Sequence, residues 1–221
     1  MHNQEVVFFD VDDTLVKGQS QKLFISFIWK RGFVSSWFYV QLMVWFFLYK
    51  LHVIKDPKKV AAHAFSFLKN MQRRELAEMV NIFFEQVLVR EFYQDAVLLI
   101  KEHQKNGRKI YLVSNAFDSL IAKIAHYVEA DGYIATELKE KNGILSGEID
   151  GTINYGEEKA NRILKFCKKE SISLEESWGY SDHPSDVWFL KLMKTPVLVN
   201  PSKSLQKKLK GFKFNTVIFK R

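Results

Sequence analysis

Short apolar runs that end in polar residues constrain the fold of this 221-residue chain more than any other feature. The segments between the runs carry helical patterns and stop signals such as Asn106-Gly107. Strands that alternate with helices in this way predict an α/β fold with a doubly wound, Rossmann-like parallel sheet. The strands that we expect span residues 5–9, 109–113, 133–137, 177–180 and 196–199.

A long helical stretch, residues 20–92, follows the first run and interrupts this alternation. Its periodicity and its breaks at Gly32 and Asp56-Pro57 predict four helices. We interpret the stretch as a helical cap inserted into a core that consists of residues 1–19 and 93–221. The helices that we expect are 20–31, 35–50, 57–69 and 72–90 in the cap and 94–105, 118–127 and 157–169 in the core, together with a hairpin that turns at Asn142-Gly143.

The composition is that of a folded globular protein. Hydrophobic residues make up 47% and charged residues 26% of the chain, which excludes wholesale disorder. Cys167 is the single cysteine, so an internal disulfide and a multi-cysteine zinc site are excluded. The lone cysteine also indicates a reducing compartment, and residues 1–9 lack the basic start of a cleavable signal peptide. We therefore expect a cytoplasmic protein.

Positive charge is concentrated in two parts of the chain. The net charge is +8, to which residues 20–92 and the tail of residues 203–221 make the positive contributions, whereas the remaining residues are net acidic. Basic segments suit an anionic partner, such as nucleic acid, acidic lipid or a phosphorylated substrate. A solvated lysine-rich surface explains the same pattern equally well.

Paired carboxylates mark two of the expected strand ends. Asp10 and Asp12 follow the first strand two residues apart, so an extended chain would project both side chains to one side. Crowded like charges need a cation or a proton between them, and oxygen ligands suit Mg²⁺. Asp182 and Asp186 follow a later strand; Asp182 could bind the metal, while Asp186 holds Lys159 or a metal-bound water. Capping of helices and turns is the alternative role for these aspartates.

Neutral donors and a lysine complete the candidate site. Ser114 and Asn115 follow the strand of residues 109–113, and both side chains can donate to a phosphoryl oxygen without adding charge. Helix capping is the alternative role for either residue. Lys159 lies in the first turn of an expected helix, where the helix dipole disfavours a cation unless an anion lies opposite. The alternative is an ordinary exposed lysine.

These motifs occur in the order DVDDT, SN, K and DHPSD, each beyond an expected strand. In this order they resemble the haloacid dehalogenase-like phosphatase superfamily. The chain is most similar to the subfamily that contains phosphoserine phosphatase, in which a helical C1 cap follows the first motif. The similarity covers nearly the whole core and is especially close over residues 134–159.

The resemblance implies a role for each motif residue. Asp10 would be the nucleophile that forms an aspartyl phosphate, and Asp12 the general acid and base. Lys159 would neutralise Asp10 and the phosphate. Ser114 would bind the phosphoryl group, and we assign Asn115 to the same role. Mg²⁺ would be held by Asp10, the backbone carbonyl of Asp12 and Asp182, with support from Asp186. The chain departs from the family pattern at Asp13, where many relatives have Gly, and at His183, where Ser is common.

We therefore expect a Mg²⁺-dependent phosphatase that hydrolyses a phosphate monoester. The substrate-reading residues of phosphoserine phosphatase cannot be aligned onto this cap, whose apolar character resembles bacterial phosphatidylglycerophosphatase C. A lipid or other amphiphilic phosphate is thus one candidate substrate, and a small polar, phosphoserine-like phosphate is its rival. A module that binds anions or nucleic acid without catalysis, and a phosphotransferase, are alternatives, although we expect no nucleic-acid partner.

Residues 32–49 form an uncharged stretch of 18 residues in an aromatic-rich part of the cap. A single membrane span would place Asp10 and Asp182 on opposite sides of a bilayer, although they must share one site. Three interpretations remain: an interfacial helix, part of the cap core, or a dimer surface. With the first, the cap and the basic tail would contact an anionic membrane peripherally, on the cytoplasmic face of the inner membrane. The oligomeric state stays open.

Overall fold

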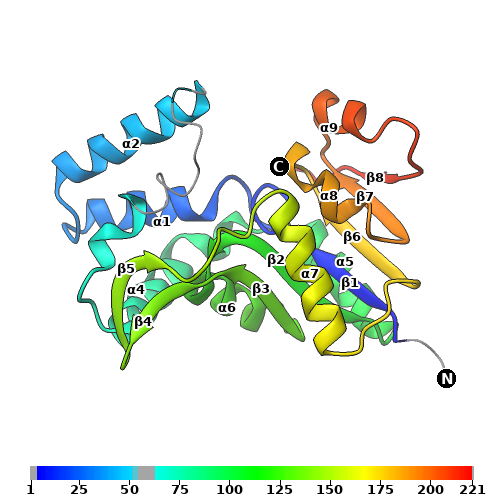
Figure 1. Ribbon diagram of the computed structural model, residues 1–221, viewed down its shortest axis with the longest axis horizontal. Coiled ribbons are helices and arrows are strands. Elements are labelled where there is room, and N and C mark those ends of the chain that lie inside the picture. The colour runs from blue at the N-terminus through cyan, green and yellow to red at the C-terminus, as the bar shows by residue number, and fades with distance from the viewer. Residues whose placement is uncertain (1–3, 52, 54–62, 221) are drawn as a thin grey trace.

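Six parallel strands form a sheet at the centre of the molecule, which confirms the predicted α/β fold (Figure 1). The computed structural model describes residues 4–51, 53 and 63–220. The strands follow the order β3-β2-β1-β6-β7-β8 across the sheet, and each neighbouring pair is parallel. Their bounds are β1 Val6–Phe9, β2 Lys109–Phe117, β3 Gly132–Thr136, β6 Ser177–Ser181, β7 Thr195–Val199 and β8 Asn215–Val217.

β1 lies in the interior of the sheet, and all four of its residues are buried because helices cover both faces. Val7 and Phe9 pack on the side of α5 and α6, whereas Val6 and Phe8 pack on the side of α7 and α8. In the sequence, a strand that is covered on both faces is typically an unbroken run of apolar residues. The core helices are α5 Gln94–Lys105, α6 Asp118–Tyr127, α7 Glu157–Lys169, α8 Val187–Leu190 and α9 Lys203–Lys208.

The lysine-rich tail contains two elements that the sequence pattern did not predict. Leu205 and Leu209, four residues apart, bury one side of α9 against the core. The chain then returns as β8, which pairs with β7 at the edge of the sheet. Two leucines among many lysines are too weak a pattern to predict a packed helix from the sequence. The structure shows that this segment packs on the core.

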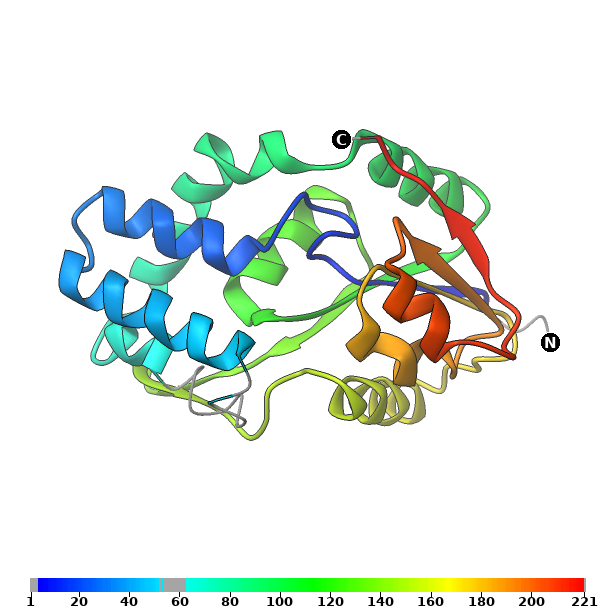
Figure 2. The same ribbon diagram turned by 90° about the horizontal axis from the view of Figure 1, so that it is seen from above.

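The described part of residues 20–92, which we call the cap, lies beside the carboxyl ends of the strands (Figures 1 and 2). Three of the predicted cap helices are present, the last one with a break at Val87; of the predicted helix 57–69, residues 57–62 lie outside the described residues. Phe24 joins the cap to the core, because its ring contacts both Phe83 and Phe117. The cap elements are α1 Ser20–Lys30, α2 Ser36–Lys50, η1 Ser66–Leu68, α4 Arg73–Gln86 and η2 Leu88–Glu91.

A β-hairpin that belongs to the core part of the chain makes hydrogen bonds with the cap. Strands β4 Leu138–Lys141 and β5 Ile144–Ile149 are antiparallel. They are joined at Asn142 and Gly143, which both have positive φ, as a tight hairpin turn requires. The backbone of Leu145 exchanges hydrogen bonds with the segment before α4, at 2.9 Å in each direction. The hairpin therefore fixes the cap at a second point, far in sequence from its connections to the core.

Candidate active site

The loop after β1 carries Asp10 to the centre of the site. The Asp10 backbone N–H donates to the Tyr180 carbonyl at 2.9 Å, which continues the sheet for one residue beyond the strand. Asp13 then adopts a φ of 54°, and its carboxylate accepts a hydrogen bond from the Gly18 N–H at 2.9 Å. This tight loop leaves Asp10 6% exposed at the carboxyl end of β1.

Lys159 lies between two buried carboxylates. Its Nζ atom is 2.6 Å from Oδ1 of Asp10 and 2.8 Å from Oδ2 of Asp186. The Ser181 hydroxyl also donates to Oδ2 of Asp186, at 2.7 Å. Burial opposes the charged form of the lysine, but the two carboxylates outweigh it and raise the pKa of Lys159 above its ordinary value. The sequence suggested that an anion lies opposite Lys159 at the start of α7, and the structure shows that two aspartates, Asp10 and Asp186, take this place.

Thr14 joins Asp10 to Asp182. Its hydroxyl oxygen lies 3.4 Å from Oδ2 of Asp10 and 3.3 Å from Oδ1 of Asp182, and it accepts the Asp182 backbone N–H at 3.1 Å. Burial raises the pKa of Asp10 well above its usual value despite the nearby lysine. Burial, together with the charges of Asp13 and Asp186, raises the pKa of Asp182 to about 7. If all of these carboxyl groups were ionised, they would carry more negative charge than one lysine balances, and the raised pKa values reflect that cost.

This donor set suits Mg²⁺. Within the described residues, no group of three or more His, Cys, Asp or Glu side chains is arranged to hold a metal ion. Mg²⁺ does not need such a group, because proteins commonly bind it through one or two carboxylates, with water and substrate phosphate as further ligands. Asp10 and Asp182 converge on the hydroxyl of Thr14 and provide two carboxylates. A divalent cation there would offset the excess negative charge.

Asp12 connects the site to the cap. Its Oδ1 atom accepts the backbone N–H of Ser20, the first residue of α1, at 2.9 Å. Burial raises the pKa of Asp12, and the contact with Ser20 partly opposes this effect. The first helix of the cap therefore begins on a carboxylate that also lines the cavity of the site.

Ser114 and Asn115 lie at an irregular end of β2, and the structure places their side chains differently. The Ser114 hydroxyl is fully buried and accepts the Ala116 N–H at 3.1 Å, whereas Asn115 lines the cavity. Asn154 holds this strand end with a bond from its side-chain amide to the Ser114 carbonyl at 2.8 Å. Thr136 similarly donates to the Asn115 carbonyl at 2.8 Å. Phosphate binding by Ser114 stays a prediction.

The structure brings together Asp10, Asp12, Asn115, Lys159, Asp182 and Asp186, which all line one cavity. Sequence reasoning assigned no role to Thr14 or to Ser181. Thr14 is the last residue of the DVDDT motif, and its place in that motif could have indicated that it belongs to the site. The contact of Ser181 with Asp186 depends on how the loop after β6 folds back, which no local pattern indicates.

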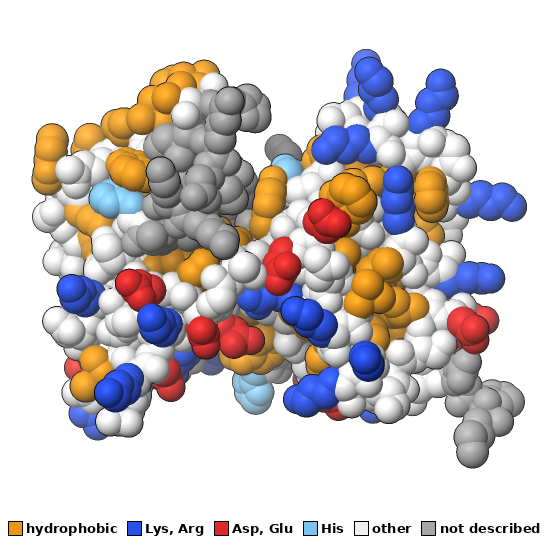
Figure 3. Space-filling model, viewed as in Figure 1, with side chains coloured by type: hydrophobic (Ala, Val, Ile, Leu, Met, Phe, Trp, Pro, Cys, Tyr) orange, Lys and Arg blue, Asp and Glu red, His pale blue; other side chains and the backbone are white. Residues whose placement is uncertain are grey.

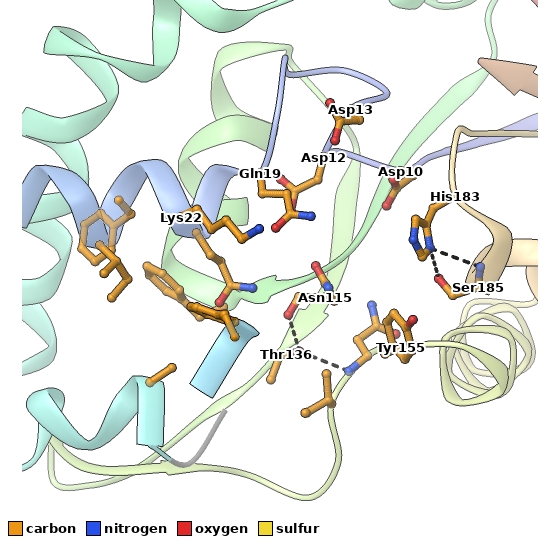
Figure 4. Close-up of a pocket in the computed structure, with 18 of the residues that line it drawn as sticks. Asp10, Asp12, Asp13, Gln19, Lys22, Asn115, Thr136, Tyr155, His183 and Ser185 are labelled. Carbon is orange, nitrogen blue, oxygen red and sulfur yellow. Dashed lines mark hydrogen bonds between the residues drawn. The ribbon is translucent and has the colours of Figure 1, made fainter. Parts of the chain in front are cut away.

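The cavity holds about 510 Å³ and has two chemically different ends (Figure 4). The polar end lies against the core and carries the aspartates and Lys159. Gln19, the last core residue before the cap, and Lys22 of the cap lie between the two ends, and Gln21 also lines the cavity. The apolar end lies within the cap and at the end of β2, and it is lined by Phe24, Ile25, Phe46, Ala64, Phe65, Phe67, Leu68 and Phe117.

Comparison with known proteins gives a family and a set of relatives. A model of haloacid dehalogenase-like hydrolases matches residues 7–191. A Mycobacterium tuberculosis protein named phosphoserine phosphatase is 28% identical over 207 residues, which cover 90% of this chain and 66% of that relative. The chain thus spans just under two thirds of the relative's length. A Neisseria meningitidis protein named histidinol-phosphatase is 23% identical over 211 residues, which cover 94% of this chain and 95% of that relative.

The fold also matches a solved structure. The crystal structure of a Bordetella pertussis protein of unknown function superposes with a TM-score of 0.88. The two sequences are 23% identical, and the match covers 97% of this chain and 98% of that one. This similarity supports the fold and leaves the substrate to be argued from the cavity.

Proposed function

This chain belongs to the haloacid dehalogenase-like hydrolase family, and on that premise we propose that it is a phosphatase that hydrolyses phosphate monoesters through an aspartyl phosphate on Asp10. The contact between Asp10 and Lys159 at 2.6 Å is the observation that carries the proposal. It orients a buried carboxylate at the end of a central strand, in a cavity large enough for a small organic phosphate. The names of the relatives agree with this reaction class.

In the first half of the reaction, a carboxylate oxygen of Asp10 attacks phosphorus, and the bond from phosphorus to the leaving oxygen breaks. Asp12 gives its proton to that oxygen as the alcohol leaves. In the second half, Asp12 takes a proton from water, whose oxygen attacks the phosphorus of the aspartyl phosphate, and the bond from phosphorus to the Asp10 oxygen breaks. Inorganic phosphate leaves, and Asp10 and Asp12 return to their starting states.

Charge neutralisation and alignment account for most of the catalysis of such a transfer. Lys159 holds a positive charge against Asp10, and Asp186 fixes that lysine at 2.8 Å. We assign Asn115, which lines the cavity, to the phosphoryl oxygens, together with Ser114, whose buried hydroxyl would have to turn from the Ala116 N–H to reach them. Bound Mg²⁺, held by Asp10, Asp182 and the backbone carbonyl of Asp12 with support from Asp186, would neutralise further charge on the phosphoryl group.

Hydrolysis of p-nitrophenyl phosphate tests the reaction class. We expect the purified protein to release p-nitrophenol with Mg²⁺, and to lose at least about tenfold in rate when EDTA removes the ion, because Lys159 alone then offsets the charge of the carboxylates and the phosphate. Added Mg²⁺ should restore the rate. Absence of turnover, together with phosphate binding, would favour the alternative of a non-catalytic anion-binding module. Transfer of the phosphoryl group to an added alcohol in preference to water would indicate a phosphotransferase.

For the substrate, we propose an amphiphilic phosphate, of which a lipid phosphate is the leading example. The apolar end of the cavity supports this choice, because Phe46, Phe65 and Phe67 would leave a small polar leaving group without partners. We further propose that residues 20–92 act as a cap over a core of residues 1–19 and 93–221. With a lipid substrate, the protein would work in the cytoplasm, peripherally at the inner membrane. A small polar phosphate, such as those in the relatives' names, is the rival substrate.

A series of alkyl phosphates tests the substrate class. We expect kcat/KM to rise with chain length by up to about fourfold for each methylene that becomes buried, until the apolar end is full. Phe46→Ala should reduce the rate for a long alkyl phosphate and leave ethyl phosphate almost unaffected. Phosphoserine and histidinol phosphate serve as the polar comparison, and a preference for either over decyl phosphate would contradict the amphiphilic assignment.

A further inference from the structure

Helix α2 exposes a continuous apolar stripe. Phe33, Val40, Val44 and Leu51 are exposed, as are Trp37 at 70% and Phe47 at 61%. We call these six residues the α2 stripe. Trp37, Val40, Val44 and Phe47 recur at alternating intervals of three and four, so they share one side of the helix, and Phe33 and Leu51 lie just before and just after it. The opposite side of α2 packs on the cap through Leu42, which is fully buried.

The structure thus divides the uncharged stretch of residues 32–49 between core and surface. Within residues 4–51, 53 and 63–220, none of the helices combines the length and the apolar character that a membrane crossing requires. Isolated exposed apolar residues are ordinary, but a contiguous stripe on a folded protein is typical of an interaction surface. We therefore expect a partner to cover the exposed side of α2 that carries the stripe.

The lysine-rich tail lies on the same side of the molecule. Figures 1 and 2 show α2 and α9 on the side that faces upward in Figure 1. In Figure 3, apolar side chains gather along the upper edge over α2, and basic side chains project from the upper edge over α9. The exposed lysines of this second region, which we call the α9 lysines, are Lys203, Lys207, Lys208, Lys210 and Lys213.

The cavity lies between these two regions. Phe46 of α2 lines the cap side, and His183 and Ser185 line the core side. Lys208 of α9 donates to the carbonyl of Pro184, which stands between those two core residues, at 3.2 Å. A flat partner that touched the α2 stripe and the α9 lysines together would therefore lie across the cavity.

We propose that the α2 stripe and the α9 lysines together dock on an anionic lipid surface. Exposed Trp and Phe side chains suit the boundary between headgroups and acyl chains, and the lysines suit acidic headgroups. A second copy that packed by the same face could cover the stripe, but it would bring the lysines of the two tails together without opposite charge, because residues 203–221 contain no acidic residue. The inference rests on the proposed function for its lipid substrate, and it adds the face by which the enzyme approaches that substrate.

Co-sedimentation with vesicles tests this face. We expect the full chain to bind vesicles of phosphatidylcholine with 30% phosphatidylglycerol at least about tenfold more tightly than vesicles of phosphatidylcholine alone, because each lysine near an anionic surface adds affinity. Trp37→Ser with Phe47→Ser should weaken binding to the anionic vesicles at least about tenfold. Lys203→Gln with Lys207→Gln and Lys210→Gln should remove most of the preference for anionic lipid. Ile82→Ser with Leu164→Ser, which changes exposed apolar residues elsewhere, is the matched control and should bind normally.

Hydrolysis of soluble p-nitrophenyl phosphate separates this inference from the proposed function. All three sets of variants should keep that activity, since none of the changed residues lines the cavity. If the protein hydrolyses p-nitrophenyl phosphate but does not bind anionic vesicles, the proposed docking face is wrong and the proposed reaction class is unaffected. Vesicle binding that persists in the Trp37 and Phe47 variant would likewise overturn the docking face. A dimer that dissociates on the same two substitutions, without any vesicle binding, would assign the stripe to a second copy of the chain.

Discussion

Asp10→Asn should lower the turnover of p-nitrophenyl phosphate by at least about 10³-fold while the protein stays folded. The carboxamide is a far weaker nucleophile than the carboxylate, so the covalent step fails. Its oxygen can still accept a hydrogen bond from Lys159, which lies 2.6 Å from Oδ1 in the unchanged protein. The substitution also removes one of the crowded buried carboxylates, so thermal unfolding should shift little.

Initial rates at saturating Mg²⁺, together with a thermal melt, measure this effect. Asp150→Asn makes the same chemical change at an exposed position and should retain full activity. Mass spectrometry must exclude deamidation of the variant back to aspartate. Full turnover by a variant shown to be intact would remove Asp10 from the role of nucleophile and with it the proposed reaction.

Lys159→Met should destabilise the protein by about 3–5 kcal/mol, because it leaves Asp10 and Asp186 buried without their cation. The methionine has a similar length but cannot donate to either carboxylate. Activity should fall as well, since the phosphoryl group would lose a neutralising charge. Urea unfolding, read as the change in the free energy of unfolding, measures the first effect.

The same helix provides the control for this prediction. Lys168→Met replaces an exposed lysine of α7 and should change stability by no more than about 0.5 kcal/mol. A double-mutant cycle with Asp10→Asn then isolates the ion pair: Lys159→Met should cost clearly less stability in the Asp10→Asn background, because that background has no buried negative charge at position 10 to leave uncompensated. Equal stability of Lys159→Met and Lys168→Met would show that the buried ion pair contributes nothing.

The strands and the motif residues could be predicted because their signals are local. A short apolar run with polar flanks, such as residues 6–9, is typical of a strand covered on both faces. The spacing of Asp10 and Asp12, and the turn at Asn142-Gly143, likewise depend on neighbours along the chain. Family resemblance then gave the motif residues their expected roles.

Other features could not be predicted because they depend on distant partners. Local pattern gave no reason for Thr14 to face both Asp10 and Asp182. It indicated neither β8 in the lysine-rich tail nor the burial of the Ser114 hydroxyl away from the cavity lining. Each depends on where the strand ends are placed in three dimensions.

The sequence by itself determined the parallel sheet and the polar residues at its carboxyl end, because hydrophobic period and short-range spacing specify both. It left the uncharged stretch of residues 32–49 with three possible roles. Only the tertiary structure decided that one side of α2 packs in the cap and the other is exposed, and that apolar cap residues and core aspartates line the same cavity. The physical reason is that burial is a property of packed surfaces, so a segment that is apolar all round does not itself specify which side the rest of the chain will cover.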